Sequence, residues 1–161
     1  MYPRYSITSV GAILVRGEKI LLVRRGFPPA KGMWSVPGGV VEAGERILDA
    51  ARRELAEETG LEAEPLGVMF IVNVVVRDRI GRVLYHYTIL DVLFDEKSLR
   101  GSLRAGGDAS EVSWLDLEEV LRREDVARGT RAVASMLVSR GRDIMKTPVL
   151  NLVEVEDFEE A

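Results

Sequence analysis

The arrangement of apolar and polar positions divides the chain into strand-like and helix-like segments. Seven segments are rich in β-branched and aliphatic residues, as strands are, and they cover 10–15, 19–24, 34–36, 66–77, 83–94, 112–115 and 149–155. Apolar residues at helical spacing occupy three further segments, which are 45–59, 118–123 and 130–140. This order predicts an α/β or α+β fold, in which helices pack against a β-sheet.

Glycine and proline mark the connections between these segments. The glycine-containing turn 16–18 predicts that the first two strands form a hairpin. Gly60 follows the first helix directly, at the position where a left-handed residue commonly ends a helix. Apart from the short strand, residues 26–44 are expected to form a loop. Residues 95–110 are expected to form a second long loop, and loops of that length are often functional.

The composition narrows the range of functions. The 161 residues include no cysteine, which excludes disulfides, thiolate metal sites and cysteine nucleophiles. His86 is the only histidine, so a site built from several histidines is excluded as well. The net charge of −4 gives no reason to expect a nucleic-acid partner. No apolar run is long enough to cross a membrane, and because no secretory signal is recognisable at the N-terminus we expect a cytoplasmic protein.

The helix predicted over 45–59 carries most of the negative charge. Eight acidic and three basic side chains between residues 42 and 64 give a local charge of −5, compared with −4 for the whole chain. At 100° per residue, the apolar face of this helix consists of Ile47, Leu48, Ala51 and Leu55. The ridge that begins with these apolar residues ends in carboxylates.

Glu54, Glu57 and Glu58 project from one quadrant at the C-terminal end of this helix. Two unit charges about 6 Å apart repel each other by roughly 3 kcal/mol at an effective dielectric constant of about 20, and the helix dipole favours cations at this end. Arg52 and Arg53 can neutralise part of the charge, and a divalent cation does so better. Oxygen-only ligands indicate Mg²⁺ or Mn²⁺. A solvated glutamate-rich surface is the alternative interpretation.

The spacing of residues 39–61 resembles the signature motif of the Nudix hydrolases. That motif requires a glycine, five residues, a glutamate, seven residues, and then Arg-Glu-aliphatic-any-Glu-Glu-any-Gly-aliphatic. Its nine constrained positions are all matched, by Gly39, Glu45, Arg53, Glu54, Leu55, Glu57, Glu58, Gly60 and Leu61. The flanking segments 32–38 and 111–115 are similar to the family as well. The resemblance covers roughly residues 7–140, and the tail from 145 to 161 lies outside it.

The resemblance implies a Nudix fold, with a mixed sheet between helices, as one domain over residues 1–161. It implies that Glu54, Glu57 and Glu58, helped by the Gly39 carbonyl, bind Mg²⁺ or Mn²⁺. It also implies that Arg53 orients the carboxylates by ion pairing. Glu57 and Glu58 are then candidates for the catalytic group, together with Arg53.

Family members hydrolyse a nucleoside diphosphate linked to another moiety, so a small-molecule nucleotide is the expected substrate. ADP-ribose, cleaved to AMP and ribose 5-phosphate, is the first candidate, because segments 24–29 and 82–87 resemble those of ADP-ribose pyrophosphatases. Oxidised nucleoside triphosphates and dinucleoside polyphosphates are the alternatives. A Nudix domain that senses a ligand is the interpretation from a different class. Because small members often dimerise, a homodimer is expected.

Other residues are candidates for contacts with the substrate. Arg24 and Arg25 end the second strand, and one of them must face the site, where a guanidinium binds phosphate; the alternative is a solvated strand end. Asp108 lies near the end of the loop predicted over 95–110, and Glu111 follows it directly, before the next strand. We expect that this loop closes over the diphosphate and that Glu111 is the catalytic base; the alternative is that both acids are merely solvated.

The aromatic residues and the histidine are assigned less specific roles. Trp34 is expected to pack in the core rather than to stack on a base, and His86 is expected to be structural or exposed. Tyr85 and Tyr87 share one face of a predicted strand and could stack an adenine, although core packing is the favoured interpretation.

Overall fold

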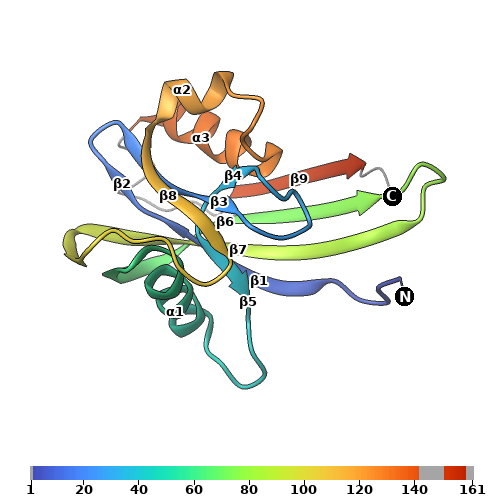
Figure 1. The fold of residues 1–161 in the computed structure, drawn as a ribbon, viewed down its shortest axis with the longest axis horizontal. Helices are drawn as coiled ribbons and strands as arrows, with labels where there is room; N and C mark the ends of the chain where they lie inside the picture. The colour runs from blue at the N-terminus through green and yellow to red at the C-terminus, as the bar shows by residue number, and fades with distance from the viewer. Residues whose placement is uncertain (1, 142–150, 159–161) are drawn as a thin grey trace.

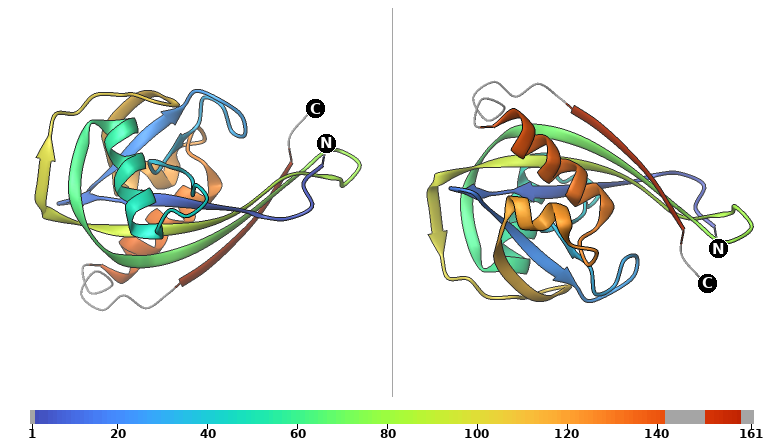
Figure 2. Two further views of the ribbon diagram at one scale, coloured as in Figure 1. Left: turned by 90° about the horizontal axis from the view of Figure 1, so that it is seen from below. Right: turned by 90° about the horizontal axis from the view of Figure 1, so that it is seen from above.

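A five-stranded β-sheet lies between helices in the computed structural model, which describes residues 2–141 and 151–158. Its strands, in spatial order, are β5 (Gly38–Val40), β1 (Ile7–Ile13), β7 (Val83–Gly101), β6 (Leu61–Arg77) and β9 (Asn151–Phe158). The helices of the described ranges are α1 (Ile47–Thr59), α2 (Leu117–Arg122) and α3 (Arg128–Arg140). The helix α1 covers one face of the sheet, and α2 and α3 lie on the opposite side (Figure 1, Figure 2).

The strand directions make this sheet mixed. β1 runs parallel to β7 and β9 parallel to β6, whereas the β1–β5 and β6–β7 pairs are antiparallel. A smaller sheet lies beside it and consists of β2 (Val15–Arg16), β3 (Lys19–Arg25), β4 (Trp34–Ser35) and β8 (Ala109–Asp116). In this sheet β3 pairs with each of the other three strands. The predicted mixed sheet between helices is therefore confirmed.

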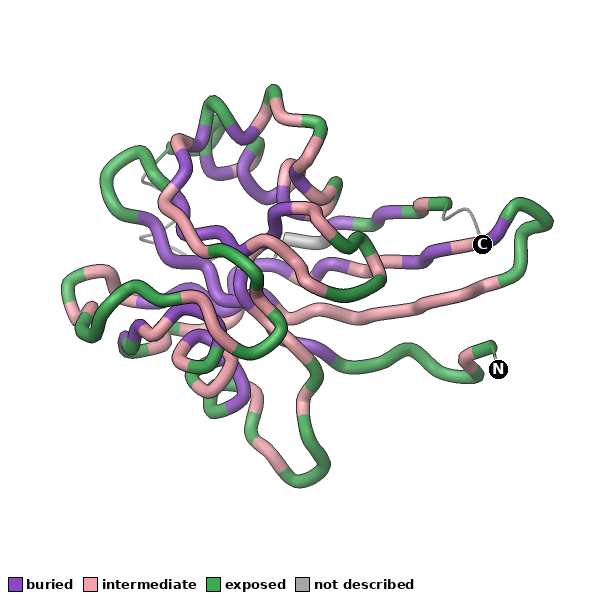
Figure 3. Tube along the Cα trace, in the orientation of Figure 1, coloured by how far each residue is buried: buried purple, intermediate pink, exposed green. Residues whose placement is uncertain are grey.

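Each face of the large sheet has its own hydrophobic core. On one face α1 contributes Ala50, Ala51 and Leu55. On the other, α2 and α3 contribute a group that includes Val120 and Val133. Burial is concentrated where the helices cover the strands, and the outer part of the β6–β7 hairpin is more exposed (Figure 3).

The helix α1 begins two residues later than predicted and ends at the predicted residue. Gly60 adopts a φ of 73°, and its N–H donates to the Ala56 carbonyl at 3.0 Å, which closes the last turn. The predicted apolar face is wrong at Leu48, which is 37% exposed, whereas Ala50 is fully buried. The helix approaches the sheet through the small side chains Ala50 and Ala51, and this orientation turns Leu48 outward.

The first predicted strand is divided between the two sheets. β1 ends at Ile13 in the large sheet, and β2 begins at Val15 in the small one. The hairpin therefore joins β2 and β3, with Val15 opposite Ile20. Every residue from 11 to 15 is buried, as expected for a chain that passes from one sheet to another between two cores.

The predicted loop over 26–44 contains a strand that the sequence analysis missed. β5 pairs with β1 in the order Gly38 with Gly11 and Gly39 with Val10. A Cβ atom at Gly38 would collide with the Val10 carbonyl, so glycine permits this close approach. Because glycine contributes no side chain to a hydrophobic pattern, that pattern could not predict this strand.

The predicted loop over 95–110 is wrong for most of its length. β7 continues to Gly101 and β8 begins at Ala109, which leaves a connection of residues 102–108. The additional strand pairs with the start of β6, where Arg100 Nε donates to Glu62 Oε2 at 2.9 Å. Such polar cross-strand pairs stabilise a strand without apolar alternation.

The C-terminal segment adds an edge strand to the large sheet. β9 lies beside β6 and buries Val153 and Val155, as the tail was expected to add a strand. Positions 149 and 150 of the predicted strand lie outside the described residues. Within the described ranges, no helix has the length and apolar character needed to cross a membrane.

Candidate active site

Arg53 lies at the centre of a group of carboxylates on α1 and in the loop just before it. Its Nε and Nη2 donate to the two Glu45 oxygens at 2.8 and 2.9 Å, a two-pronged arrangement typical of strong arginine–carboxylate pairs. Its Nη1 donates to Glu54 Oε1 at 2.7 Å and to Glu57 Oε2 at 3.4 Å. The hydrogen bonds from Arg53 lower the pKa of Glu45 to about 2. One guanidinium thus holds three carboxylates in fixed positions.

Glu58 is the most deeply buried carboxylate of this group. It is 6% exposed, and its Oε2 accepts a hydrogen bond from the Gly38 backbone N–H at 3.0 Å. Burial, with a smaller contribution from the Glu54 charge, raises its pKa to about 7 against the opposing effect of that hydrogen bond. Burial also raises the pKa of Glu54, although Arg53 opposes this shift. Two adjacent acids therefore resist ionisation, and a cation placed between them would be strongly favoured.

The glycine loop before α1 is packed directly against these acids. A Cβ atom at Gly39 would fall on the Glu54 carboxyl group, so only glycine leaves room for that carboxyl group in this position. The donors of Gly39, Glu54, Glu57 and Glu58 are all oxygen atoms, which suit Mg²⁺ or Mn²⁺ in chemistry and charge.

The side chains of this group do not surround a single point. No three histidine, cysteine or acidic side chains of the described residues are arranged around a common cation position. Arg53 instead lies between Glu54 and Glu57 and bonds to both. The donor set therefore fits a divalent cation, but in this structure Arg53 supplies the neutralising charge.

Arg24 and Arg25 are adjacent on β3 and have different partners. The charge of Arg25 lowers the pKa of Glu58 and so acts on the carboxylate group. Arg24 instead pairs with Glu111, with Nη1 and Oε1 3.2 Å apart, and the two residues are opposite each other on β3 and β8. Of the two arginines, Arg25 is therefore the one whose charge reaches the acids of α1.

Asp108, at the end of the 102–108 connection, and Glu111, on β8, also have different surroundings. The Gly106 N–H donates to the Glu58 carbonyl at 3.2 Å, so this connection lies on the end of α1. The charge of Asp108 raises the pKa of both Glu54 and Glu58. Glu111, in contrast, is exposed and paired with Arg24. The structure thus brings Asp108 to the carboxylate group, although the sequence analysis preferred Glu111.

Trp34 and His86 take part in the packing and pairing of the strands. Trp34 is 6% exposed and belongs to the core beneath α2 and α3. His86 Nε2 lies 2.9 Å from Asn73 Oδ1 on the neighbouring strand β6. Both residues therefore have the structural roles that the sequence analysis expected.

Asp91 is a buried acid that the sequence analysis missed. It is 2% exposed on β7, and its side chain fills the space where Gly11 lacks a Cβ atom. Among the described residues, no group donates a hydrogen bond to its Oδ1. Burial raises its pKa to about 7. In the sequence, its position as the single acid within the apolar run of residues 89–94 could have indicated that it is buried.

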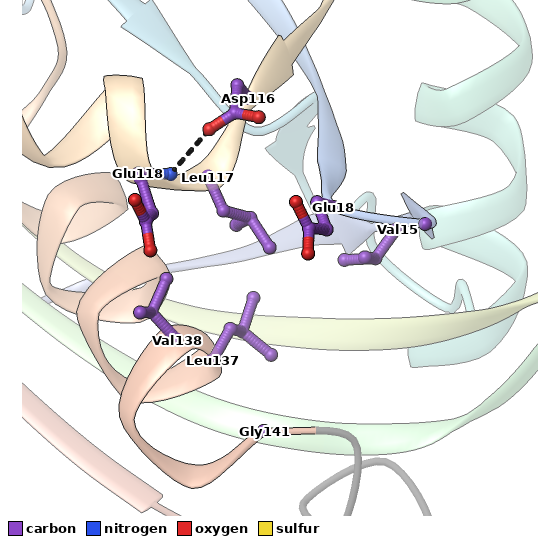
Figure 4. A pocket seen from close by; sticks show the side chains of 9 residues that line it. Val15, Glu18, Asp116, Leu117, Glu118, Leu137, Val138 and Gly141 are labelled. Carbon is purple, nitrogen blue, oxygen red and sulfur yellow. Dashed lines mark hydrogen bonds between the residues drawn. The ribbon is translucent and has the colours of Figure 1, made fainter.

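A surface hollow elsewhere on the molecule is separate from this group. It lies between the β2–β3 turn and the helices α2 and α3, and Figure 4 shows Glu18, Asp116 and Glu118 around an apolar floor that includes Leu117 and Leu137. None of the α1 carboxylates lines it. The acids of α1 therefore remain the candidate site.

Comparison with known proteins matches most of the chain to one family. Residues 6–136 match the NUDIX domain. An ADP-ribose pyrophosphatase of Methanocaldococcus jannaschii is 38% identical over 112 residues, which are 70% of this chain and 63% of that protein. A candidate 8-oxo-dGTP diphosphatase of Mycobacterium tuberculosis is 48% identical over 60 residues, 37% of this chain and 43% of that protein.

The fold comparison agrees with the sequence comparison. The crystal structure of a MutT NUDIX hydrolase from Burkholderia pseudomallei superimposes with a TM-score of 0.70 at 25% identity, and covers 82% of this chain and 98% of that one. The matched region spans less than two thirds of the length of either relative named above.

Proposed function

The chain belongs to the Nudix hydrolase family, and from this premise we propose that it hydrolyses the pyrophosphate bond of a nucleoside diphosphate linked to another moiety. The observation that carries the proposal is the arrangement around α1, where Arg53 bonds to Glu45, Glu54 and Glu57 while Glu58 is buried against Gly38. Such an acidic group can approach a diphosphate only when additional positive charge is present.

In this reaction we assign a separate role to each residue of the site. A divalent cation, held by Gly39, Glu54, Glu57 and Glu58, would supply positive charge at the phosphate oxygens and acidify the attacking water. Arg53 keeps the carboxylates oriented, and Arg25 binds a phosphate oxygen. Water then attacks one phosphorus atom and the anhydride P–O bond breaks.

The attacking water must lose a proton to a nearby base. We assign this role to Asp108 rather than to Glu111, because the Asp108 charge acts on Glu54 and Glu58. Glu57 and Glu58 are the alternatives within α1. Asp108→Asn is expected to lower kcat by on the order of 100-fold, with Glu111→Gln as the matched control that retains nearly full kcat. If both variants keep kcat within a few-fold of the unmodified protein, the base belongs to α1.

ADP-ribose is the proposed substrate, with AMP and ribose 5-phosphate as products. The similarity to the pyrophosphatase of M. jannaschii over 70% of the chain supports it. The similarity to the M. tuberculosis protein supports oxidised nucleoside triphosphates as the second candidate. A panel with ADP-ribose, 8-oxo-dGTP and a diadenosine polyphosphate, followed by identification of the products, separates these activities.

One variant tests the proposed site directly. Glu58→Gln keeps the volume of the side chain and an oxygen that can accept from Gly38 N–H, so the fold should persist. We expect kcat to fall by on the order of 100-fold, and full turnover in excess EDTA would contradict the metal requirement. Glu62→Gln is the matched control, because Glu62 is exposed and pairs with Arg100 on the strands. Equal kcat in the two variants would remove Glu58 from the mechanism.

Two further proposals concern the protein as a whole. We propose a cytoplasmic homodimer, on the basis of its family and of the edge strand β9, whose outer side is available for pairing in the described part of the chain. Light scattering at micromolar concentration tests the proposed homodimer, and a monomer mass would contradict it.

A further inference from the structure

The 102–108 connection caps the end of α1 that carries the acids. The last carbonyl groups of a helix have no partner within the helix, and here the connection donates hydrogen bonds to two of them. Arg104 N–H donates to the Thr59 carbonyl at 2.8 Å. Gly106 N–H donates to the Glu58 carbonyl at 3.2 Å. Asp108 therefore lies two residues beyond a backbone contact with the acidic helix.

Glycine allows the connection to approach α1 this closely. A Cβ atom at Gly106 would collide with the backbone carbonyl oxygen of Glu57. A Cβ atom at Gly107 would lie 3.8 Å from the Glu57 carbonyl oxygen and 3.9 Å from Glu58 Cγ, which is ordinary van der Waals contact. The backbone just before Asp108 is thus packed against two of the acidic residues themselves.

A second segment, the loop of residues 26–32, holds the other end of the connection. Gly26 N–H donates to the Asp108 carbonyl at 2.9 Å. A Cβ atom at Gly26 would lie 2.9 Å from that same carbonyl oxygen, which is closer than side-chain carbons come to a backbone atom. Gly26 is not among the residues with a positive φ, so this contact, and not the backbone conformation, is what requires glycine.

The 26–32 loop is itself fixed by the two arginines that end β3. Arg24 Nε donates to the Gly32 carbonyl at 2.9 Å, and Arg25 Nε donates to the Pro29 carbonyl at 2.7 Å. Gly32 N–H also donates to the Arg25 carbonyl at 2.8 Å, which closes the loop at its base. Because it is held at these three points, the loop can act as a support for a neighbouring segment.

We propose that the 26–32 loop is the support that holds the 102–108 connection on α1, and that Gly26 is the positioning residue through which it sets the place of Asp108. This inference rests on the proposed function, in which Asp108 accepts the proton of the attacking water. The connection is bonded to α1 and to the 26–32 loop before any substrate is bound. A base that is held in place in advance needs no rearrangement during turnover.

Gly26→Ala tests this support without altering a side chain of the site. The added methyl group must displace the Asp108 carbonyl, and misplacement of a catalytic group by about 1 Å can cost about 100-fold in rate. We expect kcat to fall at least about 10-fold while KM stays within about threefold, because the groups that bind the substrate do not move. Gly106→Ala, which displaces the connection from α1, should act in the same way. Gly129→Ala is the matched control and should retain kcat, because Gly129 lies on α3 and faces Val72.

A double variant shows whether Gly26 acts through Asp108. If it does, Gly26→Ala combined with Asp108→Asn should have the kcat of Asp108→Asn alone, within about twofold, because a base that is already absent cannot be misplaced. Independent effects would instead multiply, and a kcat lowered by the product of the two single losses would overturn the assignment. A Gly26→Ala variant with the kcat of the unmodified protein would overturn it as well.

Hydrogen exchange measured by NMR tests the support without turnover. The amides of Arg104 and Gly106 should exchange slowly in the unmodified protein, because both are bonded to α1. Gly26→Ala should accelerate exchange at both amides by about 10-fold or more, whereas Gly129→Ala should leave them unchanged. Equal exchange rates in Gly26→Ala and the unmodified protein would overturn the proposal. If exchange accelerates but Asp108→Asn keeps full kcat, the choice of base in the proposed function fails while the support stands.

Discussion

Replacing Asp91 with asparagine is expected to remove a pH-dependent loss of stability. Burial raises the pKa of this carboxyl from 3.8 to about 7. Below the lower of these two values the side chain is protonated in both the folded and the unfolded chain. Between them the unfolded chain releases the proton while the folded chain keeps it, so the free energy of unfolding falls as the pH rises. Asparagine has nearly the same shape and does not titrate.

The size of the effect follows from the shift in the pKa. A shift of about three units, at about 1.36 kcal/mol for each, corresponds to about 4 kcal/mol. This loss is complete once the pH exceeds the folded-state pKa, where the folded chain is ionised as well. The substituted amide also leaves a buried polar group without a partner, because none of the described groups donates to Asp91 Oδ1. That cost does not depend on pH, so the change with pH is the quantity to measure.

Urea unfolding at intervals between about pH 4.5 and 8.5 checks this expectation. The free energy of unfolding of Asp91→Asn, minus that of the unmodified protein, should increase by up to about 4 kcal/mol over this range. Asp49→Asn is the control, because Asp49 is exposed and pairs with Arg52 on the surface of α1; its difference should stay within about 1 kcal/mol. A difference for Asp91→Asn that is constant with pH would refute the reasoning.

Three further substitutions test the surroundings of the acids. Arg53→Lys loses the two-pronged contact with Glu45 and is expected to lower kcat at least about 10-fold, measured by steady-state kinetics; full activity would show that a point charge suffices. Gly39→Ala places a methyl group on the Glu54 carboxyl and should reduce kcat more than it reduces the melting temperature, and an unchanged kcat would contradict the packing. Gly60→Ala forces a left-handed alanine against a backbone carbonyl and should cost about 1 kcal/mol or more in the free energy of unfolding, and a urea midpoint equal to that of the unmodified protein would refute this.

The sequence predicted the acidic helix because its information is local. Helical spacing alone puts Glu54, Glu57 and Glu58 on one side, and Gly60 marks the end of the helix. Strand pairing by Gly38 and Gly39 was missed, because glycines carry no hydrophobic pattern. The continuation of β7 beyond residue 94 was missed for a related reason, since its partners on β6 include the polar residues Glu62 and Glu64.

The assignment of individual side chains to the site required the tertiary structure. Arg24 and Arg25 are equivalent in sequence, and only the pairing of β3 with β8 shows that Arg24 meets Glu111 and leaves Arg25 to the acids. The register shifts at this point, since Arg25 pairs with Ala109 rather than with residue 110. A shift of one residue reverses the faces of a strand.

The sequence by itself determined the family, the acidic end of α1 and the chemistry that its carboxylates can perform. The tertiary structure decided which distant groups reach them, namely Asp108 from the connection of residues 102–108 and Arg25 from β3. The physical reason is that spacing within one helix follows from its own geometry. Contacts between distant segments instead depend on strand register, bulges and packing, which no single segment of sequence specifies.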